Sequence, residues 1–225
     1  MEVVVNAATS VDGKLSTRER RQVHISGEAD FDRVDRLRAA ADAVLVGVGT
    51  VLADDPHLGV KSEDRRVERL RNGRPANPAR VVADSRARTP TDATVLDDDA
   101  ATYLLVSAAA PDDRLDTLRD AGTDVTVIRA GEERVDLRAA LAALDDAGVD
   151  RLLAEGGGEL VFSLFEAGLV DELSVFVGSL VVGGRDAPTL ADGEGFVEAF
   201  PALDLVDVDR VDDGVVLRYR VDGRP

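Results

Sequence analysis

Cysteine is absent from the 225-residue chain, and histidine is nearly so. Without cysteine there is no disulfide, no thiolate metal site and no cysteine nucleophile. The two histidines, His24 and His57, are too few for a multi-histidine metal centre, and no neighbouring nucleophile and carboxylate mark a hydrolytic triad. The sequence therefore predicts no resident metal, and each histidine is expected to be structural or to contact a ligand.

Basic residues are also scarce. The chain has 44 acidic and 27 basic residues, a formal net charge of −17, and only Lys14 and Lys61 are lysines. Because 44% of the residues are hydrophobic, the excess of acid does not indicate disorder. An evenly acidic, lysine-poor surface is typical of proteins adapted to molar salt, which screens the repulsion between like charges. Such a surface argues against a nucleic-acid partner, since no basic stripe is present to meet phosphates.

Long apolar runs are missing as well. No stretch approaches the roughly 20 apolar residues of a membrane span, and the N-terminus lacks the basic region and apolar core of a signal peptide. We therefore expect a soluble, cytoplasmic protein with no membrane partner. Since no repeat, low-complexity segment or linker interrupts the chain, a single domain over residues 1–225 is expected.

Short apolar runs alternate with segments of helical periodicity, which is the pattern of an α/β fold. The expected strands are residues 3–8, 43–48, 80–83, 102–107, 125–128, 152–154, 172–177, 205–211 and 215–221. The expected helices are residues 28–41 (with Phe31, Val34, Leu37 and Ala41 on one face), 65–72, a segment near 113–121, one marked by Leu137, Ala140, Leu141 and Leu144, and 159–169. The sequence Asp212-Asp213-Gly214 is a hairpin signal. The expected architecture is a mainly parallel central sheet with flanking helices and an antiparallel C-terminal edge hairpin.

The segment from Leu152 to Leu169 carries the strongest functional signal. A short apolar strand is followed by Glu155, three glycines and a helical run. The glycines allow a ligand to approach the backbone, and the helix N-terminus offers free N–H groups, as in phosphate sites. A tight strand-to-helix turn without a ligand explains the glycines equally well. Glu155 favours the ligand site, because ligands bind at the carboxyl ends of strands in α/β sheets.

Other loops that contain polar residues are weaker signals. Gly47-Val-Gly49 follows a strand but lacks the third glycine of a dinucleotide fingerprint, so a plain turn is the simpler explanation. In Asp54-Asp55-Pro56 the acids could cap backbone amides or orient a ligand hydroxyl. The segment 10–14 has the pattern of a β-turn with Gly13 at positive φ. Ser85-Arg86 could hold a phosphate or be an exposed loop.

Taken in order, five motifs resemble one family: SVDGK at 10–14, GVGTVLADDP at 47–56, VVADSRARTP at 81–90, LLAEGGGEL at 152–160 and GLVDELSVFV at 168–177. Together they resemble the reductases of riboflavin biosynthesis, the RibD C-terminal domain-like family, which has the dihydrofolate-reductase-like fold. The free-standing archaeal form is the most similar. The zinc deaminase to which the bacterial domain is fused needs cysteine ligands, so the reductase alone is expected here.

The resemblance implies that NADPH delivers a hydride to C1′ of 2,5-diamino-6-ribosylamino-4(3H)-pyrimidinone 5′-phosphate in its ring-opened imine form. The small phosphorylated pyrimidine and the cofactor are the implied partners, and a homodimer is the implied assembly. Implied cofactor contacts are Ala8, Thr50, Asp54, Ser85, Arg86, Gly156, Gly157, Gly158 and Glu159. Implied substrate contacts are Arg38, Leu58, Lys61 and Glu155. No residue is identified as the general acid, so the proton is expected from water or from the substrate.

Two other functions stay open at this point. One is a dihydrofolate or pterin reductase on the same fold, against which the EGGG and DDP motifs argue. The other is a non-catalytic module that binds NADPH. The choice between NADPH and NADH, and between the diamino and the deaminated pyrimidine, is also open.

Overall fold

The computed structural model describes residues 1–222, which form two compact units. The first unit comprises residue 1 and residues 35–153, and the second comprises residues 2–34 and the C-terminal part of the chain from residue 154. Helix α1 (Glu28–Ala40) contributes residues to both units. Whether the chain acts as a single domain stays a prediction.

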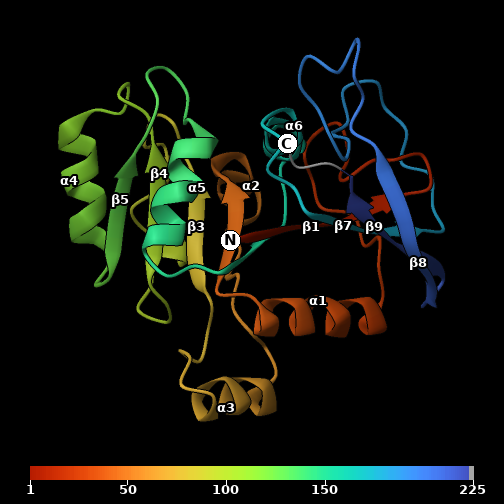
Figure 1. The fold of residues 1–225 in the computed structure, drawn as a ribbon, viewed down its shortest axis with the longest axis horizontal. Coiled ribbons are helices and arrows are strands. Elements are labelled where there is room, and N and C mark those ends of the chain that lie inside the picture. The colour runs from red at the N-terminus through yellow and green to blue at the C-terminus, as the bar shows by residue number, and fades with distance from the viewer. Residues whose placement is uncertain (223–225) are drawn as a thin grey trace. The chain divides into compact units, whose positions relative to one another are not determined.

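The first unit has the strand order β5-β4-β3-β2-β6, in which β5, β4, β3 and β2 pair in parallel. The strands are β2 (Ala43–Gly47), β3 (Ala79–Ala83), β4 (Thr102–Val106), β5 (Val125–Arg129) and β6 (Arg151–Ala154). The helices are α2 (Val48–Asp54), α3 (Glu63–Arg71), α4 (Asp112–Ala121) and α5 (Leu137–Asp146), with the short 3₁₀ helix η1 (Thr94–Leu96). Helix α2 packs on β2, and α4 and α5 pack on β5 (Figure 1).

The second unit has the strand order β1-β7-β9-β8. These strands are β1 (Glu2–Ser10), β7 (Glu172–Gly178), β8 (Leu203–Val211) and β9 (Gly214–Val221), and the unit also contains helix α6 (Gly158–Glu166). Strands β1 and β7 are parallel, whereas β9 is antiparallel to both of its neighbours. The expected α/β class, mainly parallel sheet and C-terminal antiparallel hairpin are therefore confirmed.

Continuous apolar runs form the central strands because such strands are covered on both faces. In β2 the side chains of Ala43, Val44, Leu45 and Val46 are all fully buried. The β2–β3 register pairs Ala43 with Ala79 and Gly47 with Ala83. The carboxyl ends of these two strands therefore lie side by side, which is where α/β sheets place their ligands.

Two expectations about local structure are wrong. Residues 48–54, which were expected to begin as a turn after the strand, form helix α2 directly after Gly47. A lone Gly49 within a helix lowers helix propensity only modestly, so the GxG pattern did not exclude a helix. On α1, Phe31 is 49% exposed rather than buried, while Asp30 and Asp35 are buried. The hydrophobic pattern missed this face because its buried residues are hydrogen-bonded carboxylates.

Both ends of α1 are capped by side chains that are distant in sequence. Asp212, in the β8–β9 turn at φ 49°, accepts bonds from the amides of Ala29 (3.3 Å) and Asp30 (3.0 Å). At the other end, buried Arg69 donates to the carbonyl oxygens of Ala39 (2.7 Å) and Ala41 (2.8 Å). Burial and the charge of Arg74 lower the pKa of Arg69 to about 10. In residues 1–222, no helix is long and apolar enough to cross a membrane.

Candidate active site

Two groups of predicted cofactor residues lie at the carboxyl edge of the first unit's sheet. Thr50 and Asp54 stand one helical turn apart on α2, directly after β2, so both are on the same face of that helix. Ser85 and Arg86 follow β3, the neighbouring parallel strand. Because the ends of β2 and β3 are paired, the structure brings these two groups to one edge of the sheet.

The turn after β3 is held rigidly by hydrogen bonds. Ser85 accepts a bond from the Val135 amide on its hydroxyl (3.1 Å) and one from the Ser107 hydroxyl on its carbonyl oxygen (2.8 Å). Asp84, which is fully buried, accepts bonds from the amide and the hydroxyl of Thr89. Arg86 projects from this fixed turn with 66% of its side chain exposed, 3.5 Å from Glu133. An exposed guanidinium on a rigid turn is suited to grip a phosphate.

The two aspartates after α2 have different environments. Asp55 adopts a left-handed conformation at φ 40° and ends the helix, and its carboxylate binds the amide and the hydroxyl of Thr94, both at 2.7 Å. It is thus the acid that caps a backbone amide, one of the two roles considered for this pair. Asp54 is exposed on the last turn of α2. Asp54 is therefore the aspartate of this pair whose carboxylate is open to a ligand hydroxyl.

The predicted substrate residues of the first unit belong to α1 and to the segment that follows α2. Arg38 on α1 donates to the carbonyl oxygen of Gly59 at 3.1 Å, so the structure joins it to the segment that carries Leu58 and Lys61. Leu58 is 2% exposed at φ 58°, whereas the Lys61 side chain is exposed. Leu58 is therefore part of the packed interior, and Lys61 lies at the surface.

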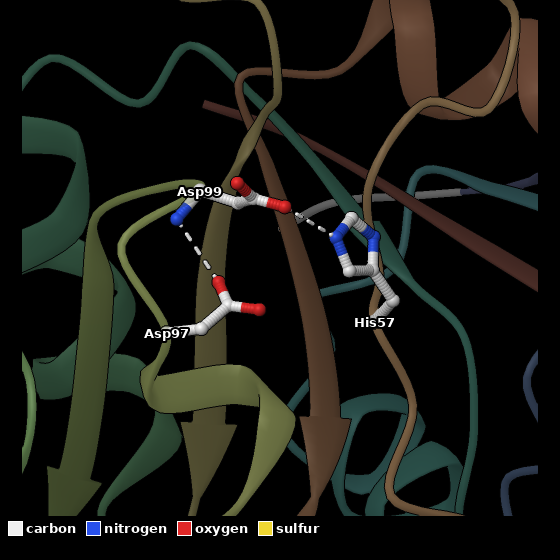
Figure 2. A group of neighbouring side chains, drawn as sticks. All are labelled: His57, Asp97 and Asp99. Carbon is white, nitrogen blue, oxygen red and sulfur yellow. Dashed lines mark hydrogen bonds and ion pairs between the residues drawn. The ribbon is translucent and has the colours of Figure 1, made fainter.

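A cluster of His57, Asp97 and Asp99 lies at the start of this segment (Figure 2). His57 Nδ1 accepts a bond from the Gly59 amide at 3.2 Å, so in neutral His57 the proton is on Nε2, which lies 2.9 Å from Asp99 Oδ2. Asp97 accepts from the Asp99 amide at 3.0 Å and pairs with Arg80 at 2.7 Å. The three groups could together ligate a cation, but each already has a protein partner, so we interpret the cluster as a structural link.

The predicted ligand loop, residues 155–157, precedes α6 in the second unit. Gly156 and Gly157 have φ of 152° and 88°, values that side chains with a Cβ rarely adopt. A Cβ at Gly158 would lie 2.4 Å from the Thr189 carbonyl oxygen. The first two glycines are thus required by conformation, and the third by packing. The residue before α6, Gly157, has no side chain with which to cap the helix.

The remaining predicted residues of this unit occupy strand and loop positions around these elements. Ala8 is half-buried on β1 opposite Phe176 of β7. Glu155 is half-buried directly after β6, and Glu159 is exposed in the first turn of α6. The structure places these residues without assigning them a ligand, so their roles stay predictions.

The SVDGK turn proves to be an anchoring point for the segment that follows β7. Gly13 has φ 77° and donates to the Ser10 carbonyl oxygen, as the β-turn prediction requires. Asp12 binds the amides of Val182 (3.0 Å) and Gly183 (2.8 Å), and Lys14 Nζ donates to the Ala187 carbonyl oxygen at 3.1 Å. Lys14, one of the two lysines of the chain, thus has a structural contact.

Parallel strands with polar turns at their carboxyl ends define a class of α/β proteins whose ligands commonly bind at that edge of the sheet. The family model described as the RibD C-terminal domain matches residues 1–217. The chain is 45% identical to the 2,5-diamino-6-ribosylamino-4(3H)-pyrimidinone 5′-phosphate reductase of Archaeoglobus fulgidus, over 97% of both chains. It is 44% identical to the protein of the same name from Methanothermobacter thermautotrophicus, over 98% of both. This chain therefore belongs to the RibD C-terminal domain family.

A solved structure supports the fold independently. The pyrimidine reductase-like protein of Corynebacterium diphtheriae superposes with a TM-score of 0.83 at 21% identity, covering 99% of this chain and 92% of its own. At this identity the likeness concerns the fold alone. It agrees with the α/β architecture described above.

Proposed function

We propose that this protein is an NADPH-dependent reductase of riboflavin biosynthesis. Its substrate would be 2,5-diamino-6-ribosylamino-4(3H)-pyrimidinone 5′-phosphate, and its product the corresponding ribitylamino compound. The observation that carries the proposal is the full-length similarity, at 44–45% identity, to two reductases named for this substrate. The family membership argues against a pterin reductase, the first alternative.

The residues of the chain fit a nicotinamide dinucleotide. The glycine loop before α6 suits the pyrophosphate, because Gly156 and Gly157 let a ligand approach the backbone closely beside a helix N-terminus. Thr50 and Asp54 on α2 suit a ribose or amide group through a hydroxyl and a carboxylate. Arg86 suits the 2′-phosphate that distinguishes NADPH from NADH.

The bound cofactor would supply the hydride, and the chain would bind and orient the substrate. Lys61 and Arg38 bring positive charge that suits the substrate phosphate. Glu155 would accept hydrogen bonds from substrate amino or hydroxyl groups and stabilise positive charge that develops on the imine. One hydride reaches C1′ and one proton reaches the imine nitrogen. Since no side chain is assigned as general acid, that proton would come from water or from the substrate.

The test is a direct assay in high salt. Protein, NADPH and the diamino substrate are mixed, and the nicotinamide absorbance is followed while the product is identified by mass. We expect one NADPH to be oxidised per pyrimidine reduced, with less activity on the deaminated pyrimidine and none on dihydrofolate. Binding of NADPH without turnover would instead favour the non-catalytic module.

We also propose a homodimer, supported by the exposed face of β8. Leu203, Leu205 and Val208 share one face of this edge strand, opposite Val221, Tyr219 and Leu217 of β9, and are 39%, 56% and 52% exposed. The register shift between Leu205 and Asp207 keeps the aspartates on the other face, where Arg218 pairs with Asp207 and Asp209. Light scattering should give twice the chain mass, and Leu205→Asp should give the monomer. A monomeric wild-type protein would refute this assembly.

Finally, we propose that the protein works at high salt. The proposal rests on the net charge of −17 and on the near absence of lysine. Its test is the salt dependence of stability, given below.

A further inference from the structure

The segment between α2 and α3, residues 57–62, has no regular secondary structure, yet its backbone is fixed. Four consecutive amides, from Gly59 to Ser62, each donate to a side chain. Their acceptors are His57 Nδ1 for Gly59 (3.2 Å), Asn77 Oδ1 for Val60 (3.0 Å), Asp35 Oδ1 for Lys61 (2.5 Å) and Asp35 Oδ2 for Ser62 (3.2 Å). Side chains thus replace the partners that a helix or sheet would supply.

Asp35 binds two of these four amides and does so from α1, a different element. Its carboxylate is buried, and Arg65 donates to Oδ2 at 2.8 Å. Burial by itself would raise the pKa of Asp35, but the bonds from Lys61, Arg65 and Ser62 outweigh it and hold the pKa below its ordinary value. The group is therefore ionised at neutral pH, when its hydrogen bonds are strongest.

The segment needs such restraint because Leu58 is in the left-handed region at φ 58° while its side chain is buried. A non-glycine residue keeps this conformation only where its surroundings hold it. Arg38, also on α1, binds the carbonyl oxygen of Gly59 at 3.1 Å. Helix α1 thus bonds to the segment on both sides of Val60, through the carbonyl oxygen of Gly59 and the amides of Lys61 and Ser62.

We propose that Asp35 is a positioning residue for substrate binding, which rests on the function proposed above. By fixing the amides of Lys61 and Ser62, its carboxylate sets the direction in which the Lys61 side chain leaves the backbone. Asp35 itself does not touch the substrate in this proposal. It acts by preorganising Lys61 and Leu58, so that substrate binding does not have to order the segment.

The test is Asp35→Asn, which keeps the shape but removes the charge and one of the two acceptor oxygens. Because a hydrogen bond to a charged group contributes roughly tenfold or more in an equilibrium, we expect the KM for the pyrimidine phosphate to rise about tenfold or more. The KM for NADPH should stay within about twofold, since the predicted cofactor residues on α2 are not bonded to Asp35. Without any ligand, amide exchange at Lys61 and Ser62 should accelerate about tenfold or more.

Asp42 provides a matched control. It also binds two consecutive amides through one carboxylate, those of Asp150 (3.1 Å) and Arg151 (2.8 Å), and it also pairs with an arginine, Arg74, at 2.7 Å. Asp42→Asn therefore removes the same chemistry from the amides of Asp150 and Arg151, which lie outside residues 57–62. It should leave the KM for the pyrimidine and the exchange at Lys61 unchanged.

The outcomes are separable. If wild-type protein does not reduce the pyrimidine, the proposed function is refuted and the role of Asp35 with it. If wild-type protein is active but Asp35→Asn keeps its KM, or Asp42→Asn raises KM equally, only the role of Asp35 is refuted. Should Asp35→Asn not fold, Asp35→Glu retains the charge but displaces the oxygens by one methylene. A folded Asp35→Glu with wild-type KM would also overturn the proposal.

Discussion

Replacing Arg80 by methionine should destabilise the protein more than replacement of any surface arginine. Arg80 lies in β3, and its side chain is fully buried. Its guanidinium donates to the carbonyl oxygens of His57 (3.2 Å), Val95 (3.3 Å) and Asp97 (3.1 Å), and pairs with Asp97 Oδ1 at 2.7 Å. Methionine refills most of the volume but leaves all four acceptors without this donor.

The expected loss follows from these contacts. A buried acceptor left without a partner costs about 1–3 kcal/mol, which applies to the carbonyl oxygens of His57 and Asp97. The Val95 carbonyl oxygen keeps its bond from the Thr102 hydroxyl, and Asp97 Oδ1 keeps its bond from the Asp99 amide, so these two acceptors cost less. The Asp97 carboxylate is 41% exposed, so water replaces part of its lost ion pair. Together these terms predict a loss of about 3–5 kcal/mol in the free energy of unfolding, the range for breaking a buried pair by removing one partner.

Urea unfolding in molar salt, followed by circular dichroism, measures this loss. Arg119→Met is the control, since Arg119 pairs at 2.8 Å with Asp116 on α4 while both side chains are about half exposed or more. It should cost about 0.5 kcal/mol or less. A loss below about 1 kcal/mol for Arg80→Met would refute the reasoning, because the four contacts would then contribute no more than a surface pair.

The pH dependence gives an independent check on the same variant. Burial would raise the pKa of Asp97, but bonds from the Asp99 amide and from Arg80 outweigh it and lower the pKa. A carboxyl group with a lowered pKa stabilises the fold above its unfolded pKa of about 3.9, and this contribution is lost as the pH falls through the folded value. The difference between wild type and Arg80→Met should therefore shrink below about pH 4.

Three further predictions concern the site and the surface. Glu155→Gln should lower kcat by about tenfold to a thousandfold while NADPH affinity, measured by fluorescence, is preserved; lost affinity with preserved turnover would make Glu155 a cofactor residue. Arg86→Ala should raise the KM for NADPH about tenfold or more but hardly change that for NADH, and equal losses would place the 2′-phosphate elsewhere. The melting temperature should fall on dialysis from molar salt to about 0.01 M, where the Debye length grows from about 3 to about 30 Å, and an unchanged value would contradict salt adaptation.

The strands and most helices could be predicted because their signals are local. The apolar runs of β2, β4 and β6 and the Asp-Asp-Gly turn before β9 gave bounds within one or two residues of those observed. The positions of Thr50 and Ser85 at strand ends followed from the same runs. What the sequence alone could not supply was the partner of each carboxylate.

Asp35 illustrates why that information is missing. Its partners at residues 61, 62 and 65 are 26 to 30 positions away, so no periodic pattern on α1 distinguishes it from a solvated aspartate. The expectation that Phe31 would lie in the core failed because the hydrophobic pattern does not show that the buried residues of α1 include Asp30 and Asp35. His57 escaped a definite role because its acceptor nitrogen serves an amide two residues away, a contact that depends on the conformation of Leu58. The position of a charged residue in the sequence is thus a weak signal of its role, whereas its hydrogen bonds in the structure identify that role.

The aspartates of this chain perform two physically different tasks. Four of them each bind two consecutive backbone amides: Asp12, Asp35, Asp42 and Asp212. The bond from the Ser10 hydroxyl and those from the Val182 and Gly183 amides lower the pKa of Asp12 to about 2. Such contacts act at bonding distance, where dissolved ions screen little, whereas repulsion among the exposed acids extends over a Debye length. We therefore expect salt to change stability through the exposed acids, and acid to release the loops held by Asp12 and Asp35, residues 57–62 among them.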